Sequence, residues 1–183
     1  MEQVGLRTAP LHVLVIDDDQ NDAMLLELAC SMGNVNARLH FVPDGQHAIA
    51  YLEGKPPYKV RLVHPWPDLI LLDLKVPKIS GFHVLEWLRD HPRERRIPVA
   101  VLTGSDASAP MALGCALGAD AFIIGPCDFS RLTSIMHSLC NYCLKMRSHP
   151  RRSHPPRLGA RDFAPNRDLD DEASSKTFGP RVD

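Results

Sequence analysis

Five short runs of apolar residues recur along the chain, and each is followed by polar residues or by glycine and proline. The runs occupy residues 12–16, 37–42, 69–72, 99–102 and 121–124. In most of them the apolar residues stand side by side instead of alternating with polar ones, which is typical of parallel strands covered on both faces. The run at 37–42 is the weakest of the five. We therefore predict five strands of a parallel sheet.

Between these runs the apolar residues follow the period of a helix. The first predicted helix places Leu26, Leu28 and Ala29 on its buried face and ends near Gly33. Further helices are predicted over residues 44–54, 82–91, 108–117 and 128–143. Strands that alternate with helices predict an α/β fold with a doubly wound five-stranded parallel sheet.

One domain accounts for all of these elements. We place it at residues 11–147, after an N-terminal extension at 1–10. Residues 148–183 combine prolines and mixed charge with no apolar period, so we predict a disordered tail. The proline-rich stretch GKPPYKVRLVHPWP, residues 54–67, is expected to be a surface loop.

Composition narrows the class of protein. Of the 183 residues 44% are hydrophobic and 23% charged, and the net charge of −1 gives no basic field for nucleic acid. No apolar run approaches the roughly 20 residues that span a bilayer, and the N-terminus lacks the pattern of a signal peptide. The five scattered cysteines suit reduced thiols. We expect a soluble, cytoplasmic protein without nucleic-acid or membrane partners.

Polar side chains follow three of the predicted strands directly. Asp17 and Asp18 come after the first, Asp73 after the third and Thr103 after the fourth. Because functional groups of an open parallel sheet gather at the carboxyl ends of its strands, we expect these residues to lie close together. Several carboxylates at short range repel one another unless a cation neutralises them, and an all-oxygen set suits Mg²⁺. The sequence thus predicts a magnesium site at this edge.

Three segments resemble the receiver domains of bacterial two-component response regulators. VLVIDDDQNDAMLL is similar to the opening strand with its acidic pair, and IPVAVLTGS to the strand that carries a signalling hydroxyl. PDLILLDLKVPKISGFHVLEWLR is similar to the phosphoacceptor segment, with Pro77 four and Gly81 eight residues after Asp73. The resemblance covers about 11–144 and is greatest to single-domain regulators paired with phytochrome-type sensors. It implies a flavodoxin-like (βα)5 fold.

The same resemblance implies a function. Asp73 would accept phosphate from a sensor histidine kinase, with Mg²⁺ held by Asp18, Asp73, the Lys75 backbone carbonyl and Asp17. Thr103 would sense the phosphoryl group, and Phe122 would be the switch aromatic, without the hydroxyl of the more usual tyrosine. Such a protein is a phosphoacceptor and no enzyme in the ordinary sense. It would signal by contact with an unknown downstream protein, and a homodimer is left open.

One position departs from the family. Gly125, before Pro126, stands where a receiver has a lysine whose ammonium contacts the phosphoryl oxygens. We do not expect Lys75 or Lys78 to replace that lysine, and we leave open whether the Gly125–Pro126 bond is cis. The alternative function is therefore a non-switching pseudo-receiver, a protein-interaction module that works without phosphorylation.

Other readings of the sequence fit less well. Cys140 and Cys143 form a C-x-x-C inside the last predicted helix, where a packed helical face is expected rather than a redox or zinc site. A phosphatase of the haloacid dehalogenase type needs a second aspartate two residues after the first, and Lys75 stands there. A dinucleotide-binding enzyme needs G-x-G-x-x-G after the first strand, which is missing.

Overall fold

The computed structural model describes residues 9–104, 108–125 and 127–148. Within them lies one parallel five-stranded sheet with the strand order β2-β1-β3-β4-β5. The strands are β1 (Leu11–Ile16), β2 (Ala37–Val42), β3 (Leu69–Asp73), β4 (Val99–Thr103) and β5 (Ala121–Ile124). The main helices are α1 (Gln20–Met32), α2 (Gly45–Glu53), α3 (Gly81–Asp90), α4 (Ser108–Leu117) and α5 (Phe129–Ser148). The predicted doubly wound sheet is thereby confirmed.

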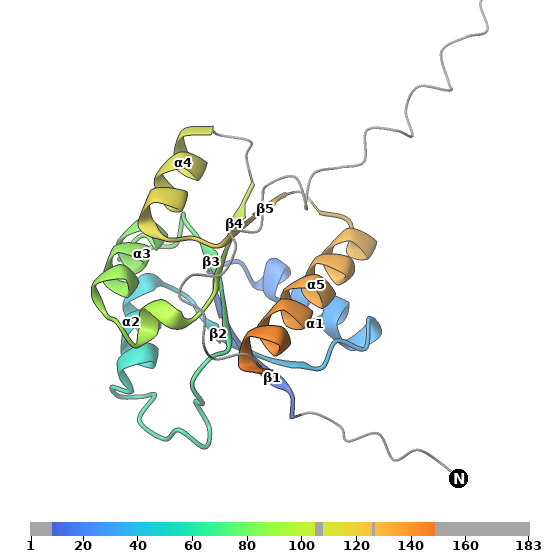
Figure 1. Cartoon of the computed structure of the whole chain (residues 1–183), viewed down its shortest axis with the longest axis horizontal. Coiled ribbons are helices and arrows are strands. Elements are labelled where there is room, and N and C mark those ends of the chain that lie inside the picture. The colour runs from blue at the N-terminus through green and yellow to red at the C-terminus, as the bar shows by residue number, and fades with distance from the viewer. Residues whose placement is uncertain (1–8, 105–107, 126, 149–183) are drawn as a thin grey trace, which may run out of the picture.

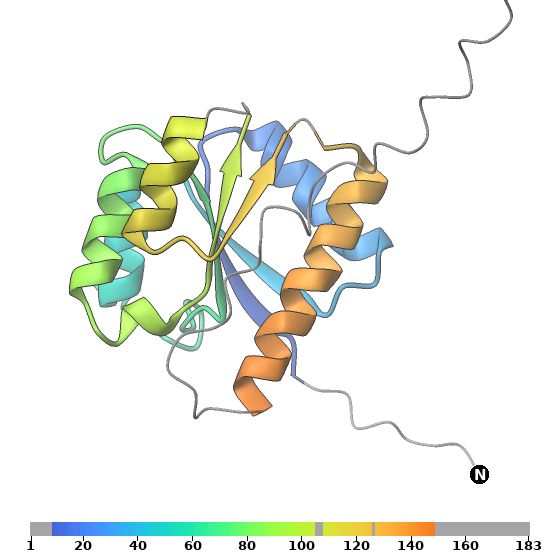
Figure 2. The same ribbon diagram turned by 45° about the horizontal axis from the view of Figure 1, so that its top comes forward.

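The helices form one layer on each side of the sheet. Helices α1 and α5 cover one face, and α2, α3 and α4 cover the other (Figures 1 and 2). Alternate residues of each central strand supply the two cores. In β3, Leu69 and Leu71 pack toward α1 and α5, whereas Ile70 and Leu72 pack toward α2 and α3. Because both faces are covered, these strands carry uninterrupted apolar runs.

The register of the sheet determines what meets at its carboxyl edge. Ile16 of β1 pairs with Leu72 of β3, so Asp17 and Asp73 are the next residues on adjacent strands. Asp73 in turn pairs with Leu102 of β4, one residue before Thr103. The strand ends that the sequence placed together therefore lie side by side.

One core assignment in α1 is wrong. Leu28 was expected on the buried face, but its side chain is 46% exposed, while Leu26, Ala29 and Cys30 are buried. A residue two positions from Leu26 lies almost on the opposite side of a helix with 3.6 residues per turn. Met24, Leu28 and Met32, four residues apart, all lie on this exposed side.

Helix α5 carries the C-x-x-C pair. Its first turn is capped by Asp128, whose carboxylate accepts a hydrogen bond of 2.8 Å from the backbone N–H of Arg131. Cys140 and Cys143 are buried against the sheet, and burial raises the pKa of both thiols to about 12. Both therefore pack as ordinary core residues, as the sequence predicted.

The lengths of the helices and the range of the described residues bear on the remaining predictions. None of the helices in the described ranges is long and apolar enough to cross a membrane. The predictions for residues 1–8 of the extension, for Pro126 and its preceding peptide bond, and for the tail beyond Ser148 lie outside the described residues.

Candidate functional site

Three carboxylates converge where β1 and β3 end. One carboxylate oxygen each of Asp17, Asp18 and Asp73 lies within 4.8 Å of the others. Asp17 and Asp73 are half-buried and Asp18 is exposed. Among the described residues this is the one group of three or more metal-ligating side chains.

Backbone hydrogen bonds orient two of these carboxylates. Asp17 accepts a bond of 2.9 Å from the N–H of Asp19, and Asp73 accepts one of 2.9 Å from the N–H of Lys75. Asp19 itself caps helix α1 by accepting from the N–H of Asn21 at 2.7 Å. The acidic run after β1 is thus divided between a helix cap and two residues at the carboxylate cluster.

The cluster is electrostatically unfavourable without a cation. Burial, and then the nearby Asp73, Asp22 and Asp18, raise the pKa of Asp17 to about 6, although the N–H of Asp19 acts in the opposite direction. Burial and the carboxylates of Asp19 and Asp73 also raise the pKa of Asp22. A hard divalent cation with oxygen ligands would relieve this repulsion, so the donor set fits Mg²⁺.

The loop after β3 is held close to the site by a glycine. A Cβ added to Gly81 would lie 2.5 Å from the carbonyl oxygen of Asp73 and 2.7 Å from Cα of Leu74. The N–H of Gly81 also donates to the Leu74 carbonyl at 3.1 Å. The spacing of eight residues between Asp73 and Gly81 therefore has a steric cause, since α3 must begin directly against the backbone of the site.

Thr103 and Gly125 lie on the adjacent strand ends. The N–H of Gly125 donates to the carbonyl of Thr103 at 2.7 Å. A Cβ added at Gly125 would find its nearest neighbour, that same carbonyl oxygen, at 3.6 Å, which is an ordinary contact. Against the residues that the structure describes, the backbone thus has room for a side chain at residue 125.

These features are those of a known family, and sequence comparison agrees. The profile of the response regulator receiver domain matches residues 13–137. The chain belongs to this family. It is therefore a receiver of the two-component signalling class, and receivers bind Mg²⁺ or Mn²⁺ at an acidic pocket.

Response regulators, one of them a phytochrome response regulator, are among the similar proteins. Rcp1 of Synechocystis sp. is 35% identical over 96 residues, which are 52% of this chain and 63% of Rcp1. The phosphorylated cyanobacterial phytochrome response regulator RcpA superposes with a TM-score of 0.66 and 30% identity, over 75% of this chain and 96% of RcpA. The Mn²⁺-bound form of Rcp1 superposes with a TM-score of 0.62 and 25% identity, over 80% of this chain and 100% of Rcp1.

The side chain of Phe122, the predicted switch aromatic, faces inward. Phe122 on β5 is 6% exposed and packs in the core beneath α4. A Cβ added to Gly114 of α4 would lie 2.8 Å from the end of the Phe122 ring. Gly114 therefore makes the space that Phe122 occupies, a role that the sequence analysis did not identify.

A second group of charges lies beside the receiver site, and the sequence did not predict it. Asp44, the N-cap of α2, is 2% exposed and contacts the Lys78 ammonium at 2.6 Å and His47 Nδ1 at 2.9 Å. Burial alone raises the pKa of Asp44, but the hydrogen bonds from Lys78 and His47 outweigh it and lower the pKa to about 2.

Lys78 itself belongs to the loop that follows the phosphoacceptor position. It adopts a φ of 61°, a left-handed conformation that is uncommon outside glycine. Its ammonium pairs with Asp44, and the expectation that it does not replace the missing lysine stays a prediction. Lys75 is exposed, and its backbone N–H binds Asp73.

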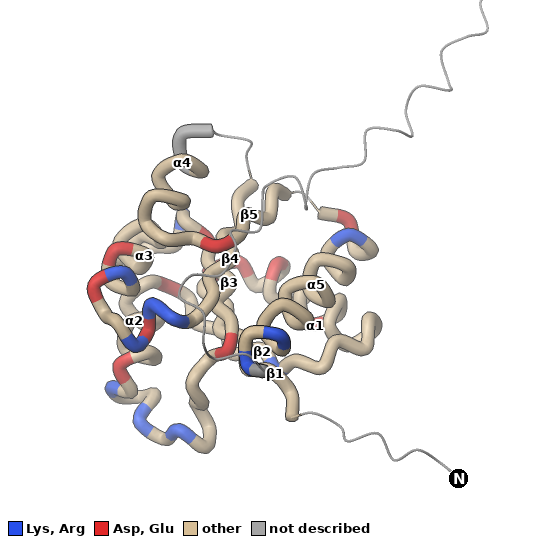
Figure 3. Tube along the Cα trace, viewed as in Figure 1, with Lys and Arg blue, Asp and Glu red and all other residues tan. Residues whose placement is uncertain are grey.

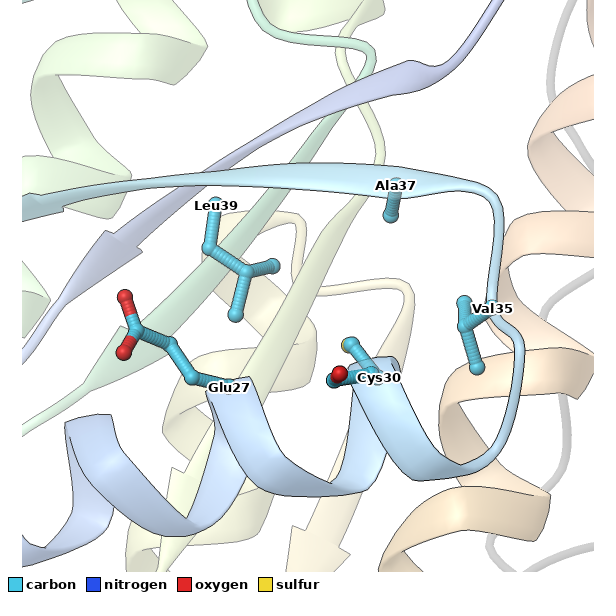
Figure 4. Close-up of a pocket in the computed structure, with 6 residues that line it drawn as sticks. Glu27, Cys30, Val35, Ala37 and Leu39 are labelled. Carbon is cyan, nitrogen blue, oxygen red and sulfur yellow. The ribbon is translucent and has the colours of Figure 1, made fainter.

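A shallow pocket lies elsewhere on the receiver, between α1 and the edge strand β2 (Figure 4). Its lining residues are Glu27, Cys30, Ser31, Val35, Ala37 and Leu39. These come from the second half of α1, the loop after it and the beginning of β2, at the end of the strands opposite the carboxylates. The predicted site residues therefore do not contribute to it.

Proposed function

We propose that this chain is a phosphoacceptor response regulator that receives a phosphoryl group on Asp73 from a sensor histidine kinase. The observation that carries the proposal is the convergence of Asp17, Asp18 and Asp73, whose ligand atoms lie within 4.8 Å of one another. Phytochrome regulators are among its relatives, so a phytochrome-type kinase is the partner that we propose. The output is contact with another protein.

Four groups would hold the metal. Asp18, Asp73 and the Lys75 carbonyl would bind Mg²⁺ directly and Asp17 through water, and the ion would supply positive charge beside the transferring phosphoryl oxygens. The Asp73 carboxylate is the nucleophile. Its oxygen forms the new bond to phosphorus as the bond to the kinase histidine breaks, and the departing nitrogen keeps the electron pair. The Lys75 N–H fixes the carboxylate for this attack.

Two residues would report the phosphoryl group. Thr103 lies one strand away from Asp73, and we assign its hydroxyl as the donor that bonds the new phosphate. Phe122, packed beneath α4, would shift with it and change the surface around α4, β5 and α5. Because phenylalanine has no hydroxyl, an outward Phe122 would offer apolar contact alone.

Gly125 supports a second candidate, the pseudo-receiver that binds a partner without phosphorylation. The missing ammonium removes a charge-assisted hydrogen bond of about 1.5–3 kcal/mol to the phosphoryl group. Within the described part of the chain, the steric room at residue 125 means that packing does not explain the loss. The two candidates differ in whether Asp73 can be phosphorylated.

Intact-protein mass after incubation with acetyl phosphate separates the two candidates. Samples with and without Mg²⁺ are compared for the unaltered chain, for Asp73→Ala and for Asp90→Ala. Asp90 is an exposed carboxylate on α3 that serves as the matched control. A phosphate increment that needs both Mg²⁺ and Asp73 supports the phosphoacceptor. No increment at long times and high donor concentration favours the pseudo-receiver.

Lys75 offers a way to tune the lifetime of the phosphate. Its exposed side chain sits two residues after Asp73, where it can restrict the approach of water to the acyl phosphate. We therefore expect Lys75→Ala to shorten the lifetime of phosphorylated protein. A lifetime unaffected by the substitution would count against this role.

A further inference from the structure

The loop between α2 and β3 exposes an unusual amount of apolar surface. Val60, Leu62 and Val63 are 56%, 99% and 60% exposed. The loop projects from the lower edge of the molecule in Figure 1, at the opposite end of the strands from the carboxylates. Three neighbouring aliphatic side chains held in water are costly unless they are covered by something.

This loop is held rigidly from within. The Arg61 guanidinium donates to the carbonyls of Tyr51 and Leu52, both at 2.9 Å, at the C-terminal end of α2. It also lies 4.5 Å from the ring centre of Trp66, and the guanidinium of Arg93 lies 4.1 Å from the same ring. The position of Leu62 is therefore set by its neighbour, so exposing it to a partner needs little further ordering.

The ring of Tyr51 supports the base of the same loop. Its centre lies 5.2 Å from that of Tyr58 and 5.7 Å from that of His64. Its hydroxyl donates to the carbonyl of Pro65 at 2.9 Å. The residues on either side of the apolar tip, Tyr58 before it and His64 and Pro65 after it, are thus anchored to α2.

Basic residues are frequent in this loop and in the segment at 89–96, whose Arg93 contacts Trp66 of the loop. The loop and the adjoining segment at 89–96 contain seven Lys or Arg residues and three acidic residues. The basic ones are Lys55, Lys59, Arg61, Arg89, Arg93, Arg95 and Arg96, and all except Arg61 are exposed. The acidic ones are Asp68, which pairs with Arg147, Asp90, which pairs with Arg89, and Glu94, while Glu53 at the end of α2 pairs with Lys55. Figure 3 shows the basic positions along the loop and beside it.

We propose that this loop is a docking surface for an anionic lipid membrane, with Val60, Leu62 and Val63 inserted among the acyl chains and the basic residues at the headgroups. Apolar side chains and neighbouring basic charges are the two contributions that bind proteins to the surface of such a membrane. From the sequence we expected no membrane partner because no segment could span a bilayer, but surface docking needs no such segment.

A membrane fits this surface better than another protein chain does. The loop projects from the molecule and Leu62 is 99% exposed, so a protein partner would need a matching socket, whereas a bilayer adapts to the side chains. A second copy of the chain would bring its own Lys55 and Lys59 against these, and three aliphatic side chains bury too little area for a stable dimer. Docked in this way, the receiver turns Asp73 away from the membrane toward a kinase.

Sedimentation with lipid vesicles tests the proposal. The full chain is mixed with vesicles of phosphatidylglycerol and phosphatidylcholine in equal parts, and with vesicles of phosphatidylcholine alone. We expect binding to the anionic vesicles, weakened about tenfold or more by Leu62→Ser and about fivefold by Lys59→Gln. Both side chains are exposed, so neither variant threatens the fold.

Met24→Ser is the matched control, because Met24 is an apolar residue 69% exposed on α1, outside this surface. It should bind the anionic vesicles as the unaltered chain does. The proposal is overturned if the unaltered chain stays in solution with the anionic vesicles, which would favour a protein socket, or if Leu62→Ser binds them equally well.

Discussion

Two carboxylates near the same edge of the sheet, Asp17 and Asp44, have pKa values shifted in opposite directions. Asp17 faces other carboxylates and has a pKa raised to about 6, chiefly by burial. Asp44 is more deeply buried, yet the contacts from Lys78 and His47 lower its pKa to about 2. Burial acts in the same direction on both groups, so the neighbours decide the difference.

The difference separates a structural charge from a functional one. The chain itself supplies the partners of the Asp44 carboxylate, whose oxygens are bonded by a helix N–H, an imidazole and an ammonium. The Asp17 cluster lacks a positive partner among these contacts and would gain one only from outside. Removing the Asp44 carboxylate should destabilise the protein. Removing the Asp17 carboxylate should stabilise the metal-free protein and weaken metal binding.

The largest effect is expected for Asp44→Ala. The substitution removes the N-cap of α2, worth about 1 kcal/mol, and a charge-assisted contact worth about 2 kcal/mol. We expect the free energy of unfolding to fall by about 3 kcal/mol, measured by urea denaturation. Asp90→Ala, at an exposed carboxylate, should change it by less than about 0.5 kcal/mol. Equal effects of the two variants would show that the Lys78 contact contributes little.

Acid should remove the contribution of Asp44 in a defined window. A carboxyl whose pKa falls from 3.8 in the unfolded chain to about 2 in the folded one stabilises the protein above pH 4. That stability, about 2 kcal/mol, is lost as the pH falls from 4 to 2. The measurement is the difference in unfolding free energy between the unaltered chain and Asp44→Asn across this range. A difference independent of pH would contradict the assignment.

Asp17→Asn should act with the opposite sign. With the folded pKa of Asp17 above its unfolded value, the ionised carboxylate destabilises the protein fully above about pH 6 and not below about pH 4. Solvent screening around this half-buried group limits the gain from the neutral side chain to about 1–2 kcal/mol at pH 7. Thermal unfolding without metal measures this gain.

Added Mg²⁺ supplies the control for Asp17→Asn. A cation that binds the folded state alone raises its stability, and the unaltered chain should gain more from it than the variant. If Asp17→Asn destabilises the metal-free protein, or if both proteins gain equally from Mg²⁺, Asp17 does not have the role assigned to it.

The sequence predicted the parts of this molecule that follow from strand periodicity. All five strands lie within one residue of the predicted runs at both ends. Four of them are buried parallel strands, which leave a largely uninterrupted apolar signal, whereas the edge strand β2 alternates apolar and polar residues. The meeting of Asp17, Asp18 and Asp73 then follows from the rule that strand ends share an edge. Both inferences needed only local pattern and topology.

Local sequence pattern could not predict the contacts that depend on loop geometry. The sequence predicted a helix that begins at Asp44, but not the ion pair of Asp44 with Lys78, a residue in a left-handed conformation that no local pattern indicates. The exposure of Leu62 likewise depends on where Arg61 anchors the loop. Helix α1 has apolar residues on its exposed side as well as on its buried side, and Leu28 was assigned to the wrong side.

Gly125→Lys would give the acidic site the positive partner that Asp44 already has. The open space around residue 125 accepts a side chain, and the new ammonium would lie at the strand end beside Thr103. A charge-assisted hydrogen bond to the transferring phosphoryl group should speed Mg²⁺-dependent phosphorylation by acetyl phosphate about tenfold. The rate is followed by intact mass over time.

Gly125→Met is the control, because methionine adds a chain of similar length without charge. It should leave the phosphorylation rate near that of the unaltered chain. A rate increase with lysine alone would show that the site lacks only the ammonium and that the rest of the phosphoacceptor machinery is in place. If lysine and methionine act alike, the missing charge at residue 125 does not limit the reaction, and the repulsion among Asp17, Asp18 and Asp73 is balanced by the metal alone.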